Sequence, residues 1–347
     1  MTQATDESIP DRYSRQILYA GIGPEGQRAL GRARVAIVGC GGLGSVQAAL
    51  LVRAGVGHVR LIDRDFVEES NLQRQILYDE SDVESLEPKA SAAARKLRQV
   101  NSLVEIEGFV DDLNPATIER LLGGVDVILD ATDNFDARYL LNDYAVKTGT
   151  PWVYGACVGS YGLTFTIVPG ETACLRCVFE SAPPAGVTPT CDTTGVLGSI
   201  VATVASLQAV EALKLAAGRR GALNRRIVML DLWDNTHDEL ELPPADPDCP
   251  CCGRRRFDYL EGRASSETSS LCGRNAVQIR VPEGGRLDLD ELAGRLAPLG
   301  HVERTPFLLR ADIDTWHLTV FGDGRAIVGG TDDPAVAKSV YARYVGI

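Results

Sequence analysis

The segment from Val35 to Asp63 constrains the fold more than any other part of the sequence. It reads VAIVGCGGLGSVQAALLVRAGVGHVRLID: an apolar run, a glycine cluster, an alanine-rich segment, and a second apolar run that ends in an acid. The glycines at Gly39, Gly41 and Gly44 allow a phosphate to approach the backbone, and the following helix would offer it unpaired N–H groups. An acid about 20 residues further on is placed to bind ribose hydroxyls. The segment predicts a βαβ nucleotide site; a turn used only for close packing is the alternative.

The rest of the chain alternates between strand and helix patterns, which indicates an α/β fold. Short apolar runs are typical of strands buried on both faces, and crossover helices make such strands parallel. Residues 163–168 alternate in polarity, so we expect an antiparallel extension there. The predicted fold is Rossmann-like, with a mainly parallel sheet. The further predicted strands are 103–110, 125–130, 152–158, 163–168 and 226–232. Predicted helices start at 88, 115 and 195, and one more follows a loop within residues 131–151. We also expect a short helix at 12–20 and mostly loop at 64–87.

A polar stretch that contains EGRASSETSS separates the α/β pattern from a smaller one near the C-terminal end. We expect a large α/β domain at 11–253, a linker at 254–275 and a small α+β accessory domain at 276–347. In the small domain the pattern predicts a strand at 277–281 and a helix at 287–296. A hairpin over residues 322–324 and a last helix at 334–344 are also expected.

The composition argues against several classes of function. The chain has 347 residues and a net charge of −12, which disfavours nonspecific binding to nucleic acid or to an anionic membrane. No signal peptide or run long enough to span a membrane is evident, so we expect a cytoplasmic protein without a membrane or nucleic-acid partner. Nine cysteines in a reducing compartment favour metal binding or thiol chemistry over disulfides.

Polar residues follow several of the predicted strands. Because ligands bind beyond the carboxyl ends of parallel strands, these residues and Asp63 should converge on the glycine turn. An arginine and a lysine there would hold a polyphosphate, and an aspartate would hold Mg²⁺. The set favours an ATP site, although each charge alone could equally belong to a solvated loop. Its members are Asn71, Arg74, Gln75, Lys89, Asp133 and Asn134.

Two cysteine pairs have the spacing of zinc knuckles. The pairs are Cys174 with Cys177 and Cys249 with Cys252, and four thiolates form a tetrahedral site. The pairs lie far apart in sequence, so the fold must bring them together. Four protein ligands leave no open position, which makes the role of the zinc structural. Redox use of the first pair, or buried free thiols, is the alternative.

Other cysteines are weaker candidates. Cys191 lies near the start of the long helix, where a thiol has a lowered pKa, so it is a candidate nucleophile. Cys272 is a second candidate thiol, whereas Cys40 and Cys157 are interpreted as packing residues. The four histidines are scattered in the sequence, and we assign them no role.

Taken together, the motifs resemble the ThiF/MoeB/HesA adenylyltransferases, relatives of ubiquitin-activating enzymes, over residues 11–253. The resemblance implies binding of Mg·ATP and of a ubiquitin-like sulfur-carrier protein that ends in Gly-Gly. It implies formation of a carrier acyl-adenylate with release of pyrophosphate, and then a thiocarboxylate for thiamine, molybdopterin or cysteine biosynthesis. A cysteine desulfurase is a candidate sulfur donor. The motifs are RYSRQIL, VGCGGLGS, AGVGHVRLID, SNLQRQILY, EPKA, DATDNFDARYLLND, CLRCVF, GVLGSI and PDCPCCG.

The resemblance also implies roles for individual residues. Gly42 would contact ATP, Arg15 would reach the neighbouring site of a homodimer, and Cys191 would form a covalent thiol adduct. The other matching positions are Asp63 for the ribose, Asn71, Arg74 and Lys89 for the phosphates, Asp133 for Mg²⁺, and Cys174, Cys177, Cys249 and Cys252 for zinc.

The sequence departs from the family pattern in two places. The loop from Tyr78 to Pro88 has more acids than expected, and residues 254–347 lie beyond the family core. The second region lacks a rhodanese-like C-x5-R loop, so we expect a docking domain for the carrier or the sulfur donor, with Cys272 as a sulfur relay. The alternatives to a carrier adenylyltransferase are an NAD-dependent oxidoreductase, a non-catalytic carrier-binding scaffold, and an enzyme that modifies a peptide C-terminus.

Overall fold

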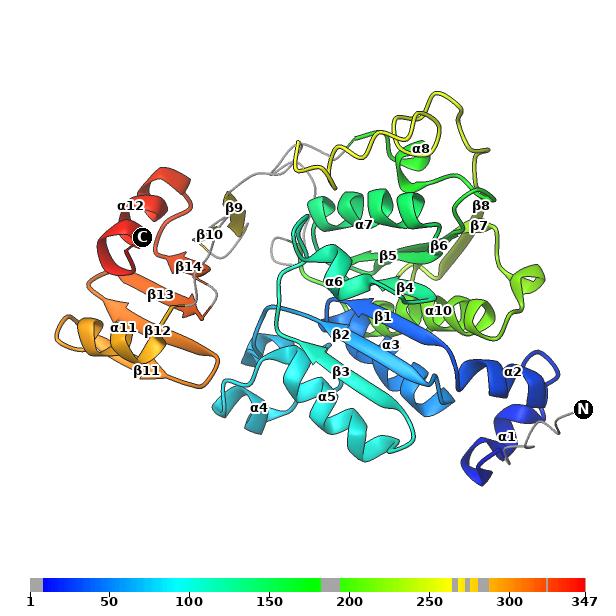
Figure 1. Cartoon of the computed structure of the whole chain (residues 1–347), viewed down its shortest axis with the longest axis horizontal. Coiled ribbons are helices and arrows are strands. Elements are labelled where there is room, and N and C mark those ends of the chain that lie inside the picture. The colour runs from blue at the N-terminus through cyan, green and yellow to red at the C-terminus, as the bar shows by residue number, and fades with distance from the viewer. Residues whose placement is uncertain are drawn as a thin grey trace, which may run out of the picture. The chain divides into compact units, whose positions relative to one another are not determined.

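The computed structural model describes residues 9–181, 194–263, 268–271, 275–279, 287–322 and 324–346 (Figure 1). The chain divides into two compact units. The large unit contains the described residues 9–181 and 196–263, and the small unit contains residues 194–195 and those from 268 onward. Each unit has its own sheet.

The large unit is built on an eight-stranded sheet with the order β3-β2-β1-β4-β5-β6-β7-β8. The first five strands in this order are parallel, and the last three are antiparallel additions. The expectation of a mainly parallel sheet with an antiparallel extension is therefore confirmed. The strands are β1 (Arg34–Val38), β2 (His58–Ile62), β3 (Glu105–Phe109), β4 (Val127–Asp130), β5 (Trp152–Val158), β6 (Tyr161–Ile167), β7 (Arg226–Asp231) and β8 (Thr236–Glu241).

Helices cover both faces of this sheet (Figure 1). One apolar cluster joins the sheet to α3 (Gly42–Ala54), α5 (Lys89–Val100) and α10 (Gly198–Ala216). A second cluster joins the other face to α6 (Ile118–Leu122) and α7 (Phe135–Thr148). Successive residues of β1 take part in the two clusters alternately, which explains why its sequence is continuously apolar.

Helix α10 is, within the part of the chain that the structure describes, the one helix long and apolar enough to cross a membrane. It packs instead against α3, with Ile200, Val201 and Val204 buried in a third apolar cluster beside Leu43 and Val46. Its composition is that of a core helix.

Several elements were not expected from the sequence. The region 64–87, interpreted as loop, contains the 3-10 turn η2 (Glu69–Asn71) and α4 (Glu80–Glu84). Strand β8 was missed because all six of its residues are exposed, so its sequence has no hydrophobic alternation. The segment before β1, where we predicted one short helix, forms a 3-10 turn and two helices. These additional elements are η1 (Asp11–Tyr13), α1 (Ser14–Ile17) and α2 (Gly23–Leu30), with α8 (Leu175–Val178) and η3 (Arg220–Ala222) later in the chain.

The small unit is an antiparallel six-stranded sheet with the order β11-β12-β13-β14-β10-β9. Two helices, α11 (Leu289–Leu296) and α12 (Pro334–Tyr344), share one apolar core with the sheet. Strand β9 lies inside the segment 254–275, which we expected to be a linker, and it pairs with β10. The strands are β9 (Thr268–Leu271), β10 (Ala276–Ile279), β11 (His301–Arg304), β12 (Leu308–Ile313), β13 (Trp316–Phe321) and β14 (Ala326–Gly329).

Candidate functional site

The glycine turn between β1 and α3 has no room for side chains. Gly39 has a φ of +95°, and a Cβ there would lie 2.4 Å from the carbonyl oxygen of Ala131. A Cβ on Gly44 would lie 1.9 Å from the carbonyl oxygen of Gly39. The turn therefore requires glycine at both positions, and its backbone stays open to a ligand at the N-terminus of α3.

Asp63 follows β2 and is fastened to this turn. Its Oδ2 accepts a hydrogen bond of 2.6 Å from the backbone N–H of Cys40, and its Oδ1 accepts one of 2.7 Å from the N–H of Asp65. Burial raises the pKa of Asp63, and the ammonium of Lys89 partly offsets that effect. The carboxylate is thus held in one orientation beside the turn, as a ribose ligand should be.

Lys89 is buried at the N-terminus of α5, and its Nζ lies 3.7 Å from Asp65 Oδ2. Burial alone would lower the pKa of Lys89, but the carboxylates of Asp65 and Asp63 outweigh it and the pKa is raised. Asp133, which follows β4, also raises this pKa, so its carboxylate acts on the same lysine. Carboxylates that follow β2 and β4 therefore both stabilise the charged form of the Lys89 ammonium group.

The loop after β2 brings further predicted residues to this edge. The Arg74 Nη1 donates to the carbonyl of Ser70, and the Cβ of Arg74 lies near the N-terminus of α10. Asn71 is buried, and its Oδ1 accepts from the N–H of Glu68 at 3.3 Å. Gln75 is also buried beside Gly41, and its Oε1 has no hydrogen-bond partner among the described residues. An unpaired amide oxygen at this place fits a site that awaits a ligand.

Asn134 and Asp133 lie where α7 begins. The Asn134 Oδ1 accepts from the N–H of Ala137 at 2.9 Å, so this side chain caps the helix. Asp133 is exposed, and the Nδ2 of Asn134 lies 3.3 Å from its Oδ1. The capping bond gives Asn134 a structural role next to the carboxylate that we predicted as the Mg²⁺ ligand. We use "carboxyl edge" for the Gly39–Gly44 turn with Asp63, Arg74, Lys89 and Asp133.

Two buried or half-buried ion pairs at this edge were not found from the sequence. Asp130, the last residue of β4, pairs with Arg138 of α7 at 3.2 Å, and both are buried. The Arg138 Nη2 also donates to the carbonyls of Thr132 and Gly155. Arg64 pairs with Asp112 at 2.7 Å. Arg64 and Asp112 follow different strands, and Arg138 lies within α7, so no familiar motif marks these pairs.

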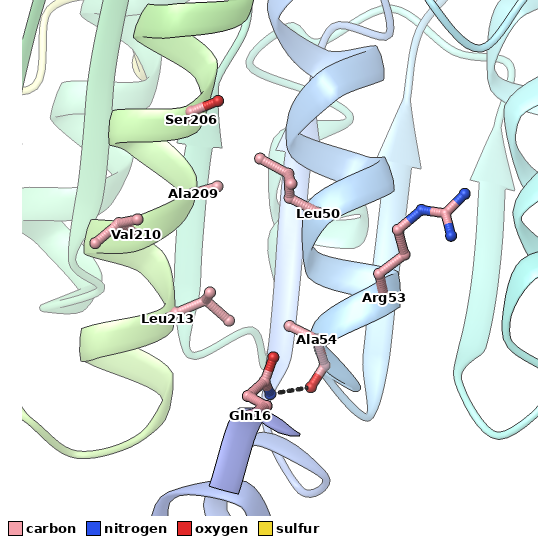
Figure 2. Close-up of a pocket in the computed structure, with 8 residues that line it drawn as sticks. All are labelled: Gln16, Leu50, Arg53, Ala54, Ser206, Ala209, Val210 and Leu213. Carbon is pink, nitrogen blue, oxygen red and sulfur yellow. Dashed lines mark hydrogen bonds between the residues drawn. The ribbon is translucent and has the colours of Figure 1, made fainter. Parts of the chain in front are cut away.

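Arg15 does not join the carboxyl edge of its own chain. It is exposed on α1, which is anchored by Gln16: the Gln16 Nε2 donates to the carbonyl of Ala54 at 2.8 Å (Figure 2). Ala54 is the last residue of α3, and a helix of 13 residues is about 20 Å long. Arg15 therefore lies beside the opposite end of α3 from the glycine turn.

A shallow pocket lies next to this anchor, between α3 and α10 (Figure 2). Leu50 of α3 and Leu213 of α10 project into it, and Val210 is 48% exposed. Leu18 and Tyr19, just after α1, are more than two-thirds exposed. The lining of the pocket includes no acid, and the hydroxyl of Ser206 donates to the carbonyl of Ala202 within its own helix. The pocket is separate from the carboxyl edge.

The four cysteines of the two predicted knuckles meet in the structure. Their Sγ atoms all lie within 4.8 Å of one another. The three contacts that fall within hydrogen-bonding range measure 3.4, 3.6 and 3.9 Å. Four thiolates around one zinc at about 2.3 Å would have S···S distances of about 3.8 Å, so the residues fit the metal. We call Cys174, Cys177, Cys249 and Cys252 the cysteine cluster.

Buried groups surround the cysteine cluster. Asn142 of α7 donates to Cys251 Sγ at 3.2 Å and accepts from the N–H of Leu175 at 2.8 Å. A hydrogen bond with Cys251 is the main reason why the pKa of Cys174 is lowered, to about 4, whereas burial raises the pKa of Cys177 and of Cys252. Cys251 lies between two cysteines of the cluster in the sequence and was left unassigned there; its contact with Asn142 is evident only in the fold. Cys191 and Cys272 lie outside the described residues.

A second group with potential ligand atoms is His58, Glu105 and Glu107, again within 4.8 Å. The same Glu107 oxygen lies 2.6 Å from His58 Nε2 and 3.0 Å from Arg60 Nε. Since a guanidinium already neutralises this carboxylate, we interpret the group as an ion-pair cluster between β2 and β3.

The fold and these contacts define a class: a nucleotide-binding α/β protein with a separate four-cysteine cluster. Residues 13–251 match the ThiF family. The chain is 47% identical to the sulfur carrier protein ThiS adenylyltransferase of Bacillus subtilis over 337 residues, which span 96% of this chain and 99% of that protein. It is 41% identical to the SAMP-activating enzyme E1 of Haloferax volcanii over 261 residues, 75% of this chain and 95% of that protein.

Among solved structures, E. coli MccB with ATP is similar in fold, with a TM-score of 0.61 and 24% identity over 70% of this chain and 74% of that one. The chain belongs to the ThiF family. The match to the Bacillus protein extends through most of the small unit. The match to the Haloferax protein covers 95% of that protein but only 75% of this chain.

Proposed function

We propose that the chain is an ATP-dependent adenylyltransferase that activates the C-terminal carboxylate of a ubiquitin-like sulfur-carrier protein. The observation that supports this most is the 47% identity to a ThiS adenylyltransferase over nearly the whole length of both chains. It favours a ThiS-like carrier, and thus thiamine biosynthesis, over a carrier for molybdopterin. The charged groups at the carboxyl edge suit a nucleoside triphosphate, whereas a dehydrogenase needs no such set of cations.

In the proposed reaction the carrier carboxylate attacks the α-phosphorus of ATP and pyrophosphate leaves. Asp63 would accept hydrogen bonds from the ribose, and the Gly39–Gly44 turn, including Gly42, would face the phosphates. Lys89 and Arg74 would stabilise the negative charge that develops on the phosphate oxygens, because both are cations at the same edge of the sheet. Asn71 and Gln75 would orient the same groups as neutral donors.

Two metals are part of the proposal. Asp133 offers an exposed carboxylate, a ligand type that Mg²⁺ prefers, and the ion there would neutralise phosphate charge. The cysteine cluster would hold a structural zinc, since its spacing fits four thiolates and leaves no open coordination position. Zinc would then tie the start of α8 to the segment that follows β8.

We further propose that the protein acts as a homodimer in which Arg15 reaches the partner's carboxyl edge. The support is that α1 lies at the far end of α3 from its own glycine turn, and that the nearby surface is apolar and exposed. A second copy would cover Leu18, Tyr19, Leu50 and Val210. Sedimentation of the purified chain would test the dimer. Mixing Arg15→Ala and Lys89→Ala chains would test complementation, since only the mixed dimer would have one complete site.

We also propose roles for Cys191, Cys272 and the small unit. Cys191 would form the covalent thiol adduct, and the small unit would dock the carrier or a sulfur donor such as a cysteine desulfurase. The Haloferax match shows that related proteins exist without room for the small unit, which suits an accessory role. If Cys272→Ala leaves both the yield of thiocarboxylate and the affinity for the carrier unchanged, the sulfur relay is wrong.

The experiment that tests the main proposal is ATP–pyrophosphate exchange with a ThiS-like carrier that ends in Gly-Gly. Exchange should depend on the carrier and vanish when the last glycine is deleted, and mass spectrometry should detect the AMP-linked carrier. Turnover of NADH without exchange would identify an oxidoreductase. Binding of the carrier without any AMP-linked product would identify a scaffold, and exchange with a free peptide alone would identify a peptide-modifying enzyme.

A further inference from the structure

Three segments that supply the proposed ATP contacts meet at one buried hydroxyl group. They are the Gly39–Gly44 turn, the loop that contains Asn71, Arg74 and Gln75, and the start of α5 at Lys89. The loop ends in Tyr78, which is 7% exposed. Its hydroxyl lies 2.7 Å from the carbonyl oxygen of Cys40 and 3.2 Å from the carbonyl oxygen of Lys89.

The hydroxyl acts as a donor in this arrangement. Both neighbours are carbonyl oxygens, which can only accept a hydrogen bond. The hydroxyl has one proton and donates it to the nearer carbonyl, that of Cys40. Burial raises the pKa of Tyr78, so the group stays protonated at neutral pH. This hydrogen bond is buried. Removal of the hydroxyl would leave the Cys40 carbonyl without its donor and destabilise the conformation of the turn.

The bond to Cys40 has a consequence for the neighbouring N–H. In a planar trans peptide the C=O and the N–H point in opposite directions. The Cys40 carbonyl and the Gly41 N–H belong to the same peptide, and the structure has no cis peptide bonds among its described residues. A hydroxyl that holds the carbonyl on one side therefore directs the Gly41 N–H to the other side. At a glycine turn, such N–H groups are the ones that face a phosphate.

The acid-rich segment that follows Tyr78 keeps this residue in place. Asp79 caps α4, and the buried Asp82 pairs with Lys96 and, at 2.7 Å, with Arg95, both on α5. Arg95 also contacts Glu87 at 2.6 Å. The extra acids between Tyr78 and Pro88 thus fasten the segment to α5, the helix that begins with Lys89. Their high number, unexplained by the sequence alone, has a structural reason.

We propose that Tyr78 is a positioning residue for ATP, whose hydroxyl sets the direction of the Gly41 N–H. The inference rests on the proposed function, because it concerns the same nucleotide. It adds that the affinity for ATP depends on a side chain that does not itself contact the nucleotide.

The test compares Tyr78→Phe with Tyr139→Phe in the full-length, zinc-loaded protein. Tyr139 is a matched control: it is buried, and its hydroxyl donates to the carbonyl of Phe179 at 2.9 Å, outside the carboxyl edge. Both variants lose one hydroxyl-to-carbonyl bond and should lower the melting temperature similarly. Only Tyr78→Phe should weaken ATP binding in calorimetry, roughly two- to tenfold, as expected for one neutral hydrogen bond.

A second measurement does not depend on ATP. Amide hydrogen exchange in the unliganded protein should become faster at residues 39–44 in Tyr78→Phe, and stay unchanged there in Tyr139→Phe. If the wild type binds ATP but Tyr78→Phe binds it within twofold, or if Tyr139→Phe loses as much affinity, this inference fails and the proposed function stands. If the wild type binds no ATP, both fail. A Tyr78→Phe chain that does not fold, beside a folded control, would replace the positioning role with a folding role.

Discussion

The carboxyl edge and the cysteine cluster both gather residues from distant parts of the chain, but they use these residues differently. At the carboxyl edge, the Lys89 ammonium lies 3.7 Å from Asp65, Arg74 donates to the backbone carbonyl of Ser70, and Asp133 is exposed. In the cysteine cluster the four Sγ atoms face one another, and Asn142 fixes the surrounding backbone. The first arrangement can accept a ligand from solution; the second is complete once a metal is present.

The two sites differ because one lies at the edge of a parallel sheet and the other is packed beside helix α7. Parallel strands end at one common edge, so polar residues after β2 and β4 point at the same space without contacting one another. The cysteines lie at the start of α8 and on the segment after β8, and their four thiolates would fill the coordination sphere of one zinc. We therefore expect changes at the carboxyl edge to alter activity, and changes at the cysteine cluster to alter stability.

The largest expected effect comes from Arg74→Ala and Asp133→Ala. Each should lower the rate of carrier-dependent ATP–pyrophosphate exchange about 10³-fold, because each removes a charged group that, in the proposed reaction, would stabilise the phosphates or hold their Mg²⁺. The melting temperature should stay at the wild-type value, since neither side chain is buried. Arg120→Ala, which removes an exposed ion pair with Asp111, is the control. A wild-type rate in either edge variant would refute the assigned site.

The next effect concerns the cysteine cluster. Cys249→Ser should release the zinc and lower the melting temperature by about 10 °C, because metal binding there stabilises only the folded chain. Metal analysis and calorimetry measure the two quantities, and Cys157→Ser outside the cluster is the control. ATP binding, measured well below the melting temperature, should persist. If Cys249→Ser loses ATP binding while it remains folded, the separation between the two regions is wrong.

A smaller effect concerns the pH dependence at the carboxyl edge. In the proposed complex the ionised Asp63 would accept hydrogen bonds from the ribose, and burial raises the pKa of this carboxyl group. Affinity for AMP should thus be full at neutral pH and fall as the pH drops through that raised pKa, above the ordinary value of about 4. At neutral pH Asp63→Asn should bind AMP about tenfold more weakly.

Calorimetry at several pH values checks this, and the Asp63→Asn variant corrects for titration of the AMP phosphate. A parallel pH dependence in wild type and variant would show that Asp63 does not control binding.

The smallest expected effect is that of Asp79→Asn on α4. The hydrogen bond from Lys96 lowers the pKa of Asp79 far below its ordinary value. An acid with a lowered folded-state pKa contributes stability above its unfolded pKa and loses that contribution as the pH falls through the folded pKa. Because the side chain is exposed, the melting temperature should drop by only about 1 °C at pH 6.

Thermal melts of wild type and Asp79→Asn at pH 6 and at pH 2 measure this contribution. The difference should shrink at the lower pH. A difference that grows on acidification would mean that the charge of Asp79 is unfavourable in the folded chain.

Much of the fold and part of the candidate site could be predicted from the sequence. The glycine turn is readable because its requirement is local: Gly39 needs a positive φ, and Gly44 lies against the backbone of Gly39. The buried strands are readable because both of their faces must be apolar. The spacing within each cysteine pair is also local, although the meeting of the two pairs is not. Exposed β8 and the short, polar α4 gave no such signal.

What the sequence determined by itself was the succession of elements and the chemical types available at the ends of the strands. Only the tertiary structure decided which of these groups contact one another. Arg64 meets Asp112, Asn142 reaches Cys251, and the Tyr78 hydroxyl reaches the carbonyl of Cys40 because separate segments pack against one another. Such contacts depend on packing across the whole sheet, and no spacing within one segment encodes them.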